Sequence, residues 1–137
     1  MLALSKVPSD VRTKTMQEAI DQGVEFLLSC DPVDANYPFG RGNSPNSSWF
    51  KFGYPIGYVS DVLQNLEALA ALDQAQDIRL VNALNYIKGK QDSQGRWRME
   101  YSLNGKMWAD IEKKGQPSKW ITLRALNVLK AAYPESK

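Results

Sequence analysis

The chain has 137 residues, of which 43% are hydrophobic and 23% are charged, a length and composition sufficient for one domain with a buried core. Its formal net charge of +2 is spread along the chain without a basic stripe, which argues against nucleic acid as a partner. Histidine is absent and Cys30 is the single cysteine. These counts exclude His-based zinc sites, Ser-His-Asp and Cys-His nucleophilic systems, and an internal disulfide.

Hydropathy gives an expectation about location. No apolar run approaches the roughly 20 residues that a membrane-spanning helix needs. The first residues, Met1 to Val7, lack the long apolar core of a secretory signal. We therefore expect a soluble protein in the cytoplasm, a reducing compartment that a chain with one cysteine fits.

The first half of the chain predicts two helices. One is expected to begin at Ser9, as its cap, and to run to about Cys30, with one buried face made of Met16, Ile20, Val24, Leu27 and Leu28. A second is expected from near Ser60 to about Leu72. Its apolar residues cover almost the whole circumference, which predicts a helix buried on most sides.

The second half repeats this order. A third helix is expected from about Asp77 to Gln91, with a single apolar stripe formed by Val81, Leu84 and Ile87. A fourth is expected from about Thr122 to Ala132 and is again apolar almost all round. Alternation of amphipathic and apolar helices favours two layers, with the amphipathic helices outside and the apolar helices inside.

A shared pattern precedes the second and fourth helices. Lys, Gly, Pro, an aromatic, a β-branched and a hydroxyl residue follow in the same order when Pro55 is aligned with Pro117. Gly and Pro would turn the chain, and Ser60 or Thr122 would cap the helix that follows. The pattern predicts a single domain, 1–137, built from two repeats of about 9–72 and about 77–132.

The end of the third predicted helix carries a family resemblance. Residues 83–97 resemble the QW motif of squalene-hopene cyclases, oxidosqualene cyclases and protein prenyltransferases, with Gln91, Gly95 and Trp97 as its core. The resemblance covers about residues 15–132, although the first repeat has Asp31 in place of the glutamine and no matching Gly-x-Trp. It implies an all-α fold in which two αα-hairpin repeats form part of an α/α toroid, with inner and outer helix layers and long aromatic-rich loops.

The resemblance also implies partners. Two helix pairs do not close the ring that complete enzymes of this family form, and an open array leaves apolar faces at its ends. We therefore expect self-association or further repeats of a longer chain, and an apolar small molecule as a possible ligand.

Catalytic residues are sparse by comparison with the family. Bacterial squalene-hopene cyclases protonate an alkene with an Asp-x-Asp-Asp motif, and the matching position here is Tyr58-Val59-Ser60-Asp61. Asp61 is a weak catalytic candidate, because one carboxylate does not reproduce the paired acids that such chemistry needs. Its other interpretation is a first-turn residue stabilised by the helix dipole. Prenyltransferases hold zinc with Asp, Cys and His, so without histidine we expect no metal and no cofactor.

Aromatic residues concentrate in the two long connections. The first contains or borders Tyr37, Phe39, Trp49, Phe50, Phe52, Tyr54 and Tyr58, and the second contains Tyr101, Trp108 and Trp120. In the family such rings line a ligand cavity, which makes Tyr58, Trp120 and Trp49 the ligand-binding candidates. The rings would equally anchor a long loop across the helix ends, and this second interpretation is the one we favour.

Two functions remain open at this point. The first is a cyclase-like module without catalytic activity of its own, which binds an apolar isoprenoid ligand or serves as a structural unit. The second is part of a terpene cyclase-like enzyme whose acidic motif lies on another segment or subunit.

Overall fold

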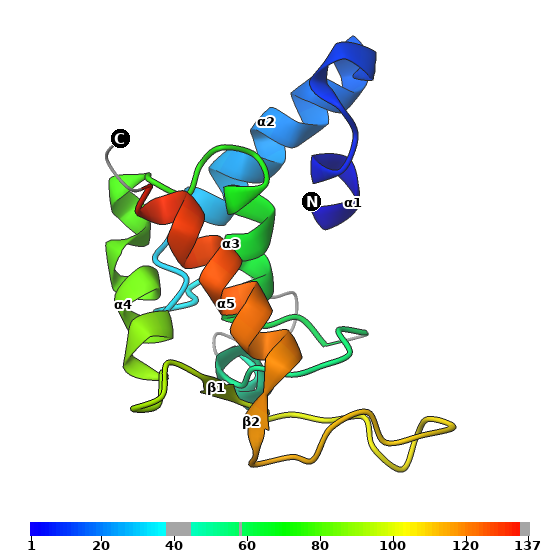
Figure 1. Ribbon diagram of the computed structural model, residues 1–137. Helices are drawn as coiled ribbons and strands as arrows, with labels where there is room; N and C mark the ends of the chain where they lie inside the picture. Colours follow the sequence, from blue (N-terminus) through cyan, green and yellow to red (C-terminus); the bar gives the residue numbers. More distant parts are fainter. Residues whose placement is uncertain (38–44, 58, 135–137) are drawn as a thin grey trace.

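The computed structural model describes residues 1–37, 45–57 and 59–134 (Figure 1). Five α-helices are present in this part: α1 (Leu2–Ser5), α2 (Lys14–Leu28), α3 (Val62–Ala70), α4 (Val81–Gly89) and α5 (Lys119–Ala132). Short 3₁₀ helices span Ser9–Val11, Ser47–Phe50 and Ile78–Leu80. Strands β1 (Trp97–Arg98) and β2 (Pro117–Ser118) form a small antiparallel sheet, with Trp97 opposite Ser118. Among these residues, no helix combines the length and the apolar character that crossing a bilayer requires.

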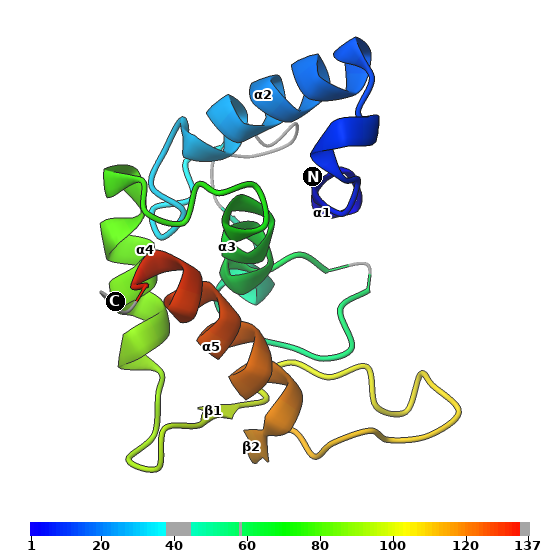
Figure 2. The ribbon, with the colours of Figure 1, turned by 45° about the horizontal axis from the view of Figure 1, so that its top comes forward.

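The core is organised around α3. Figure 2 shows α1 and α2 on one side of α3, and α4 and α5 on the other. The buried side chains of α3 include Val62, Leu63, Leu66 and Leu69. Burial of one leucine side chain stabilises the folded state by about 2 kcal/mol. Packing against neighbouring segments, rather than helix propensity, therefore stabilises this short helix. The prediction that the second helix is buried on most sides is confirmed.

The prediction of an α/α toroid is wrong. The helix–helix contact of α2 is chiefly with α1, so α2 and α3 do not form the predicted hairpin. The outer face of α5 leaves Leu123 52% and Leu126 46% exposed, which removes the second inner helix. A two-stranded sheet also contributes to the core through Trp97, so the fold is not purely helical. The described residues give no evidence of two repeated hairpins.

The predicted repeat fails at the starts of the helices. The cap of α3 is Asp61, whose side chain accepts a hydrogen bond from Gln64 N at 2.6 Å. The cap of α5 is Ser118, whose Oγ accepts from Ile121 N at 3.1 Å. Because these caps occupy different positions of the sequence pattern, the residues after Pro117 are helical where those after Pro55 are not.

The predicted caps have other roles. Ser60 is exposed and precedes the true cap of α3, while Thr122 Oγ1 lies within α5 and accepts from Trp97 N at 3.1 Å. Ser9 begins a 3₁₀ helix rather than α2. The cap of α2 is Thr13, which accepts from Met16 N at 3.3 Å. In each case a neighbouring side-chain oxygen satisfies the first-turn amides in place of the predicted one.

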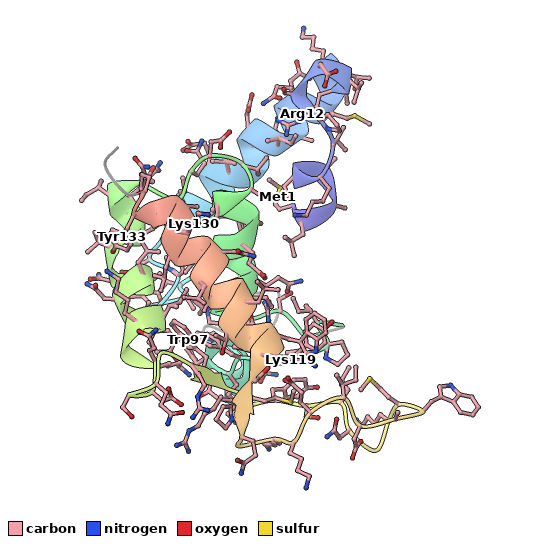
Figure 3. The ribbon with its side chains drawn as sticks, in the orientation of Figure 1. Met1, Arg12, Trp97, Lys119, Lys130 and Tyr133 are labelled. Atoms are coloured by element: carbon pink, nitrogen blue, oxygen red, sulfur yellow. The ribbon has the colours of Figure 1, made fainter. Side chains whose placement is uncertain are left out.

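The face predicted for the first helix is only partly covered. Ile20 and Leu28 of α2 are buried, and Val24 and Leu27 are half-buried. Met16 is exposed, because α2 extends beyond the body of the molecule at its beginning, near Arg12 (Figure 3). The prediction of one continuous buried stripe is therefore wrong at the N-terminal end of this helix.

Trp97 joins the end of α4 to the start of α5. Its ring is fully buried between these helices, as Figure 3 shows, and its Nε1 donates a hydrogen bond to Ile87 O at 2.7 Å. Gly95 has φ +77°, a conformation that favours glycine, and it allows the chain to reverse before Trp97. Gln91 is exposed. The carboxylate of Asp92 closes the turn instead, accepting from Gln94 N and Arg96 N at 2.9 Å each.

Candidate ligand-binding cleft

An open cleft of about 390 Å³ lies between α1, the C-terminal part of α2, the segment around Trp49 and the first turns of α3. Small-molecule sites typically occupy about 300 to 1,000 Å³, so the cleft has room for a small ligand. Its apolar lining residues include Leu2, Leu27, Trp49 and Ala68. Its polar lining residues are Ser60, Asp61, Gln64 and Asn65, which lie just before α3 and in its first turn.

Asp61 lines the cleft as the cap of α3. Its residue is 4% exposed, and three donors surround its carboxylate. Oδ1 accepts from Gln64 N at 2.6 Å and from Arg124 Nη2 at 3.3 Å, while Oδ2 accepts from Gly53 N at 3.4 Å. If this carboxyl were protonated, its proton would point toward groups that are themselves hydrogen-bond donors. The geometry therefore suits a structural carboxylate better than an acid that protonates a ligand.

Arg124 is the cation that holds this carboxylate. It is 8% exposed on the buried face of α5, and its Nη1 donates to Gly53 O at 2.9 Å. Its Nε and Nη2 also donate to Glu67, at 2.9 Å and 2.8 Å to the nearer oxygens. Burial raises the pKa of Asp61 above its usual value, and the charge of Arg124 opposes that rise. One guanidinium thus links α5, α3 and the first long connection.

Sequence reasoning missed Arg124. The residue interrupts the apolar run of the fourth predicted helix, and it falls on the same helix face as Ile121, Ala125 and Val128. An arginine on a buried face has to find carboxylates or carbonyls, because an unpaired buried charge is very costly. This rule would have flagged Arg124 and directed attention to Asp61 and Glu67 as its partners.

The predicted ligand-binding aromatics do not come together. Trp49 lies in the cleft, and its Nε1 donates to Pro32 O at 2.8 Å. Trp120 lies elsewhere and stacks on Tyr54, with ring centroids 4.9 Å apart and planes 9° from parallel. Tyr58 falls outside the described residues. The structure therefore places Trp49 and Asp61 at one cleft, without Trp120.

Several other rings anchor the first long connection. Tyr37 Oη donates to Leu27 O at 2.6 Å, at the end of α2. Tyr86 Oη and Lys90 Nζ, both from the α4 side, donate to Phe50 O at 2.8 Å and 2.7 Å. These contacts fix the loop against two helices, which is the packing role that rings with a polar tip perform when buried.

No family model, curated protein or solved structure matches the chain. Kinship with the cyclases and prenyltransferases therefore stays a prediction that depends on Gln91, Gly95 and Trp97. Within the described residues, no cluster of three or more Cys, Asp or Glu side chains is placed to hold a metal ion. The cleft beside α3 is the feature from which we infer a function.

Proposed function

We propose that the protein is a binding module without catalytic activity of its own, and that the cleft beside α3 takes an apolar small molecule. The observation that supports this proposal is the cleft of about 390 Å³ with an apolar wall from Leu2, Leu27, Trp49 and Ala68. Apolar walls with a few polar groups are the usual composition of small-molecule sites. An isoprenoid is the proposed class, and this choice comes from the resemblance of residues 83–97 to the QW motif.

The contacts of the Asp61 carboxylate support the proposal that the protein has no catalytic activity of its own. Its carboxylate is engaged by two backbone amides and by Arg124, in a geometry that a cap of α3 requires. The alternative, an enzyme completed by acids from another segment or subunit, stays a prediction, because no contact of Asp61 favours it over the structural role.

We also propose that the protein self-associates, in the cytoplasm, through the outer face of α5. Leu123 and Leu126 lie one turn apart on this face and are about half exposed. A second copy that covers the face would remove both side chains from water, a gain of about 25 cal/mol for each Å² of apolar surface buried. Light scattering should show a dimer that Leu126→Lys converts to a monomer. A wild-type monomer at high concentration contradicts the proposal.

Ligand binding is tested with a matched pair of substitutions. Leu27→Gln introduces a polar group among the apolar residues of the cleft, and Ile111→Gln makes a similar change at an exposed site in the connection before α5. We expect farnesol to raise the melting temperature of the wild-type protein and of Ile111→Gln, because a ligand that binds the folded state stabilises it. Leu27→Gln should lose this shift. Equal shifts in both variants, or no shift in the wild type, would contradict binding at the cleft.

A further inference from the structure

We propose that the ligand of the cleft is amphipathic, with a polar end that donates hydrogen bonds to the side-chain amides of Gln64 and Asn65. This inference depends on the proposed function, because it assigns the head group of the molecule that the cleft is proposed to bind. An alkylammonium carries enough protons to donate to both amide oxygens, whereas an alcohol carries one proton and donates to one of them at a time. The other end of the molecule would lie along the apolar wall that includes Leu27 and Trp49.

Two unpartnered acceptors carry the inference. Gln64 Oε1 and Asn65 Oδ1 are both buried, and neither accepts a hydrogen bond from the described residues. Both residues line the cleft. A buried acceptor without a partner costs about 1 to 3 kcal/mol. A ligand that donates to these oxygens removes the cost, whereas a ligand that only accepts leaves it in place.

The orientation of the Asn65 amide is set by its neighbours. Asn65 is 6% exposed, and its Nδ2 donates to Tyr37 Oη at 3.1 Å. The hydroxyl proton of Tyr37 is already committed, because Tyr37 Oη donates to Leu27 O at 2.6 Å. Tyr37 therefore offers Asn65 a lone pair and no proton. The NH₂ end of Asn65 has to face Tyr37, and the carbonyl end is left to accept from a ligand.

Tyr37 keeps its proton under all ordinary conditions. Burial raises the pKa of Tyr37 well above its usual value, so the hydroxyl remains a donor to Leu27 O. The chain of hydrogen bonds from Asn65 through Tyr37 to the end of α2 is therefore fixed. It orients the carbonyl of Asn65 in the absence of any ligand, which is the preorganisation that a selective site needs.

The charged side chains beside the cleft disfavour an anionic head group. Of the residues described as lining the cleft, Asp61 has the charged side chain. Arg124 is shared between Asp61 and Glu67, so the three groups together carry one net negative charge. A carboxylate or phosphate head would meet this charge and two amide oxygens. A hydroxyl or ammonium group would meet acceptors that lack donors.

A series of octyl compounds tests the inference on the wild-type protein. Octanol and octylammonium can donate, octyl methyl ether can only accept, and octanoate is anionic. Calorimetric titration should show binding of octanol and octylammonium, with the ether weaker by about five-fold, since a net hydrogen bond is worth about 1 kcal/mol. Octanoate should bind more weakly than the ether. Comparison of octanol with octylammonium then decides between the two donor classes.

A substitution locates the effect at the amides. Gln64→Met removes the acceptor at nearly the same volume and leaves the backbone contact with Asp61 in place. It should weaken octylammonium, which can donate to both amide oxygens, about five-fold and leave octyl methyl ether unchanged. Gln94→Met makes the same change at an exposed site on the turn between α4 and β1 and should alter neither.

The outcomes separate this inference from the proposed function. If none of the four compounds binds, the cleft is not an apolar ligand site and both proposals fall. If the ether and octanoate bind as tightly as octanol, the cleft takes apolar ligands but the head-group inference is overturned. Unchanged octylammonium affinity in Gln64→Met overturns the role of Gln64.

Discussion

Replacement of Arg124 by methionine should destabilise the protein by about 3 kcal/mol at neutral pH. Loss of one partner from a buried ion pair typically costs about 3 to 5 kcal/mol, because the remaining charge stays buried without compensation. Here the lower end applies for two reasons. Glu67 has a side chain that is 20% exposed and can regain water. Asp61 keeps two backbone donors, Gln64 N and Gly53 N, after Arg124 is gone.

The same substitution should respond to pH and to a second change. The pKa of Asp61 is raised by burial and should rise further without Arg124, so protonation relieves the buried charge. The penalty should therefore be full above the raised pKa and shrink as pH falls through it. Asp61→Asn combined with Arg124→Met should be more stable than Arg124→Met alone, because it leaves no unpaired carboxylate at position 61.

Urea unfolding followed by circular dichroism measures each effect. For a chain of this size, 3 kcal/mol corresponds to a fall in melting temperature of about 10 °C. The reasoning is refuted if Arg124→Met lies within about 1 kcal/mol of the wild type, a cost typical of surface substitutions. It is refuted equally if the double variant is no more stable than the single one.

Four further substitutions test local contacts by chemical denaturation. Trp97→Phe should cost about 2 kcal/mol, because it leaves a cavity and removes one of the two hydrogen bonds that Ile87 O accepts, the other coming from Lys90 N; a cost below 1 kcal/mol contradicts this. Ser118→Ala should cost about 1 kcal/mol and Ser60→Ala almost nothing, since only Ser118 caps a helix; the reverse order refutes the capping assignment. Gly95→Ala should cost about 1 kcal/mol because its φ is +77°; a neutral result contradicts it.

The positions of the main helices could be predicted from the sequence because their periodicity is local. The apolar circumference of the helix expected from near Ser60 to about Leu72 correctly indicated that α3 is buried on most sides, and the stripe of Val81, Leu84 and Ile87 correctly indicated a helix. Of that stripe, Leu84 and Ile87 are buried while Val81 is 43% exposed. Whether a segment forms a helix can be inferred from the spacing of its apolar residues. The burial of a given turn depends on which other segments pack against it. The spacing of apolar residues contains no information about those contacts.

The repeat misled because similar residues perform different tasks in the two halves. Pro117 lies in strand β2, opposite Arg98, and Ser118 immediately caps α5. In the first half the helix begins only after its cap Asp61, six residues after Pro55, and the same carboxylate pairs with Arg124. A local pattern contains no information about this long-range ion pair. The layering inferred from the repeat failed with it.

The candidate cleft depends on contacts across the whole chain. Asp61 and Trp49 were singled out from the sequence, but Gln64 and Asn65 were not, because an amide in a helix usually faces water. Their role emerges only when α1 and the end of α2 lie over the first turns of α3. Tyr37, which precedes α3 by more than twenty residues, then orients Asn65.

Stability and binding should be coupled through the first turn of α3. The residue that caps this turn, Asp61, is held from α5 by Arg124, and the next two side chains along the helix after Leu63 are the amides of the cleft. A change at Arg124 that frays the turn would also displace Gln64 and Asn65, although Arg124 does not line the cleft. Arg124→Met should therefore weaken octanol binding more than it weakens octyl methyl ether. A protein in which Arg124→Met lowers stability but leaves the head-group preference intact would show that the ion pair supports the helix without positioning the amides.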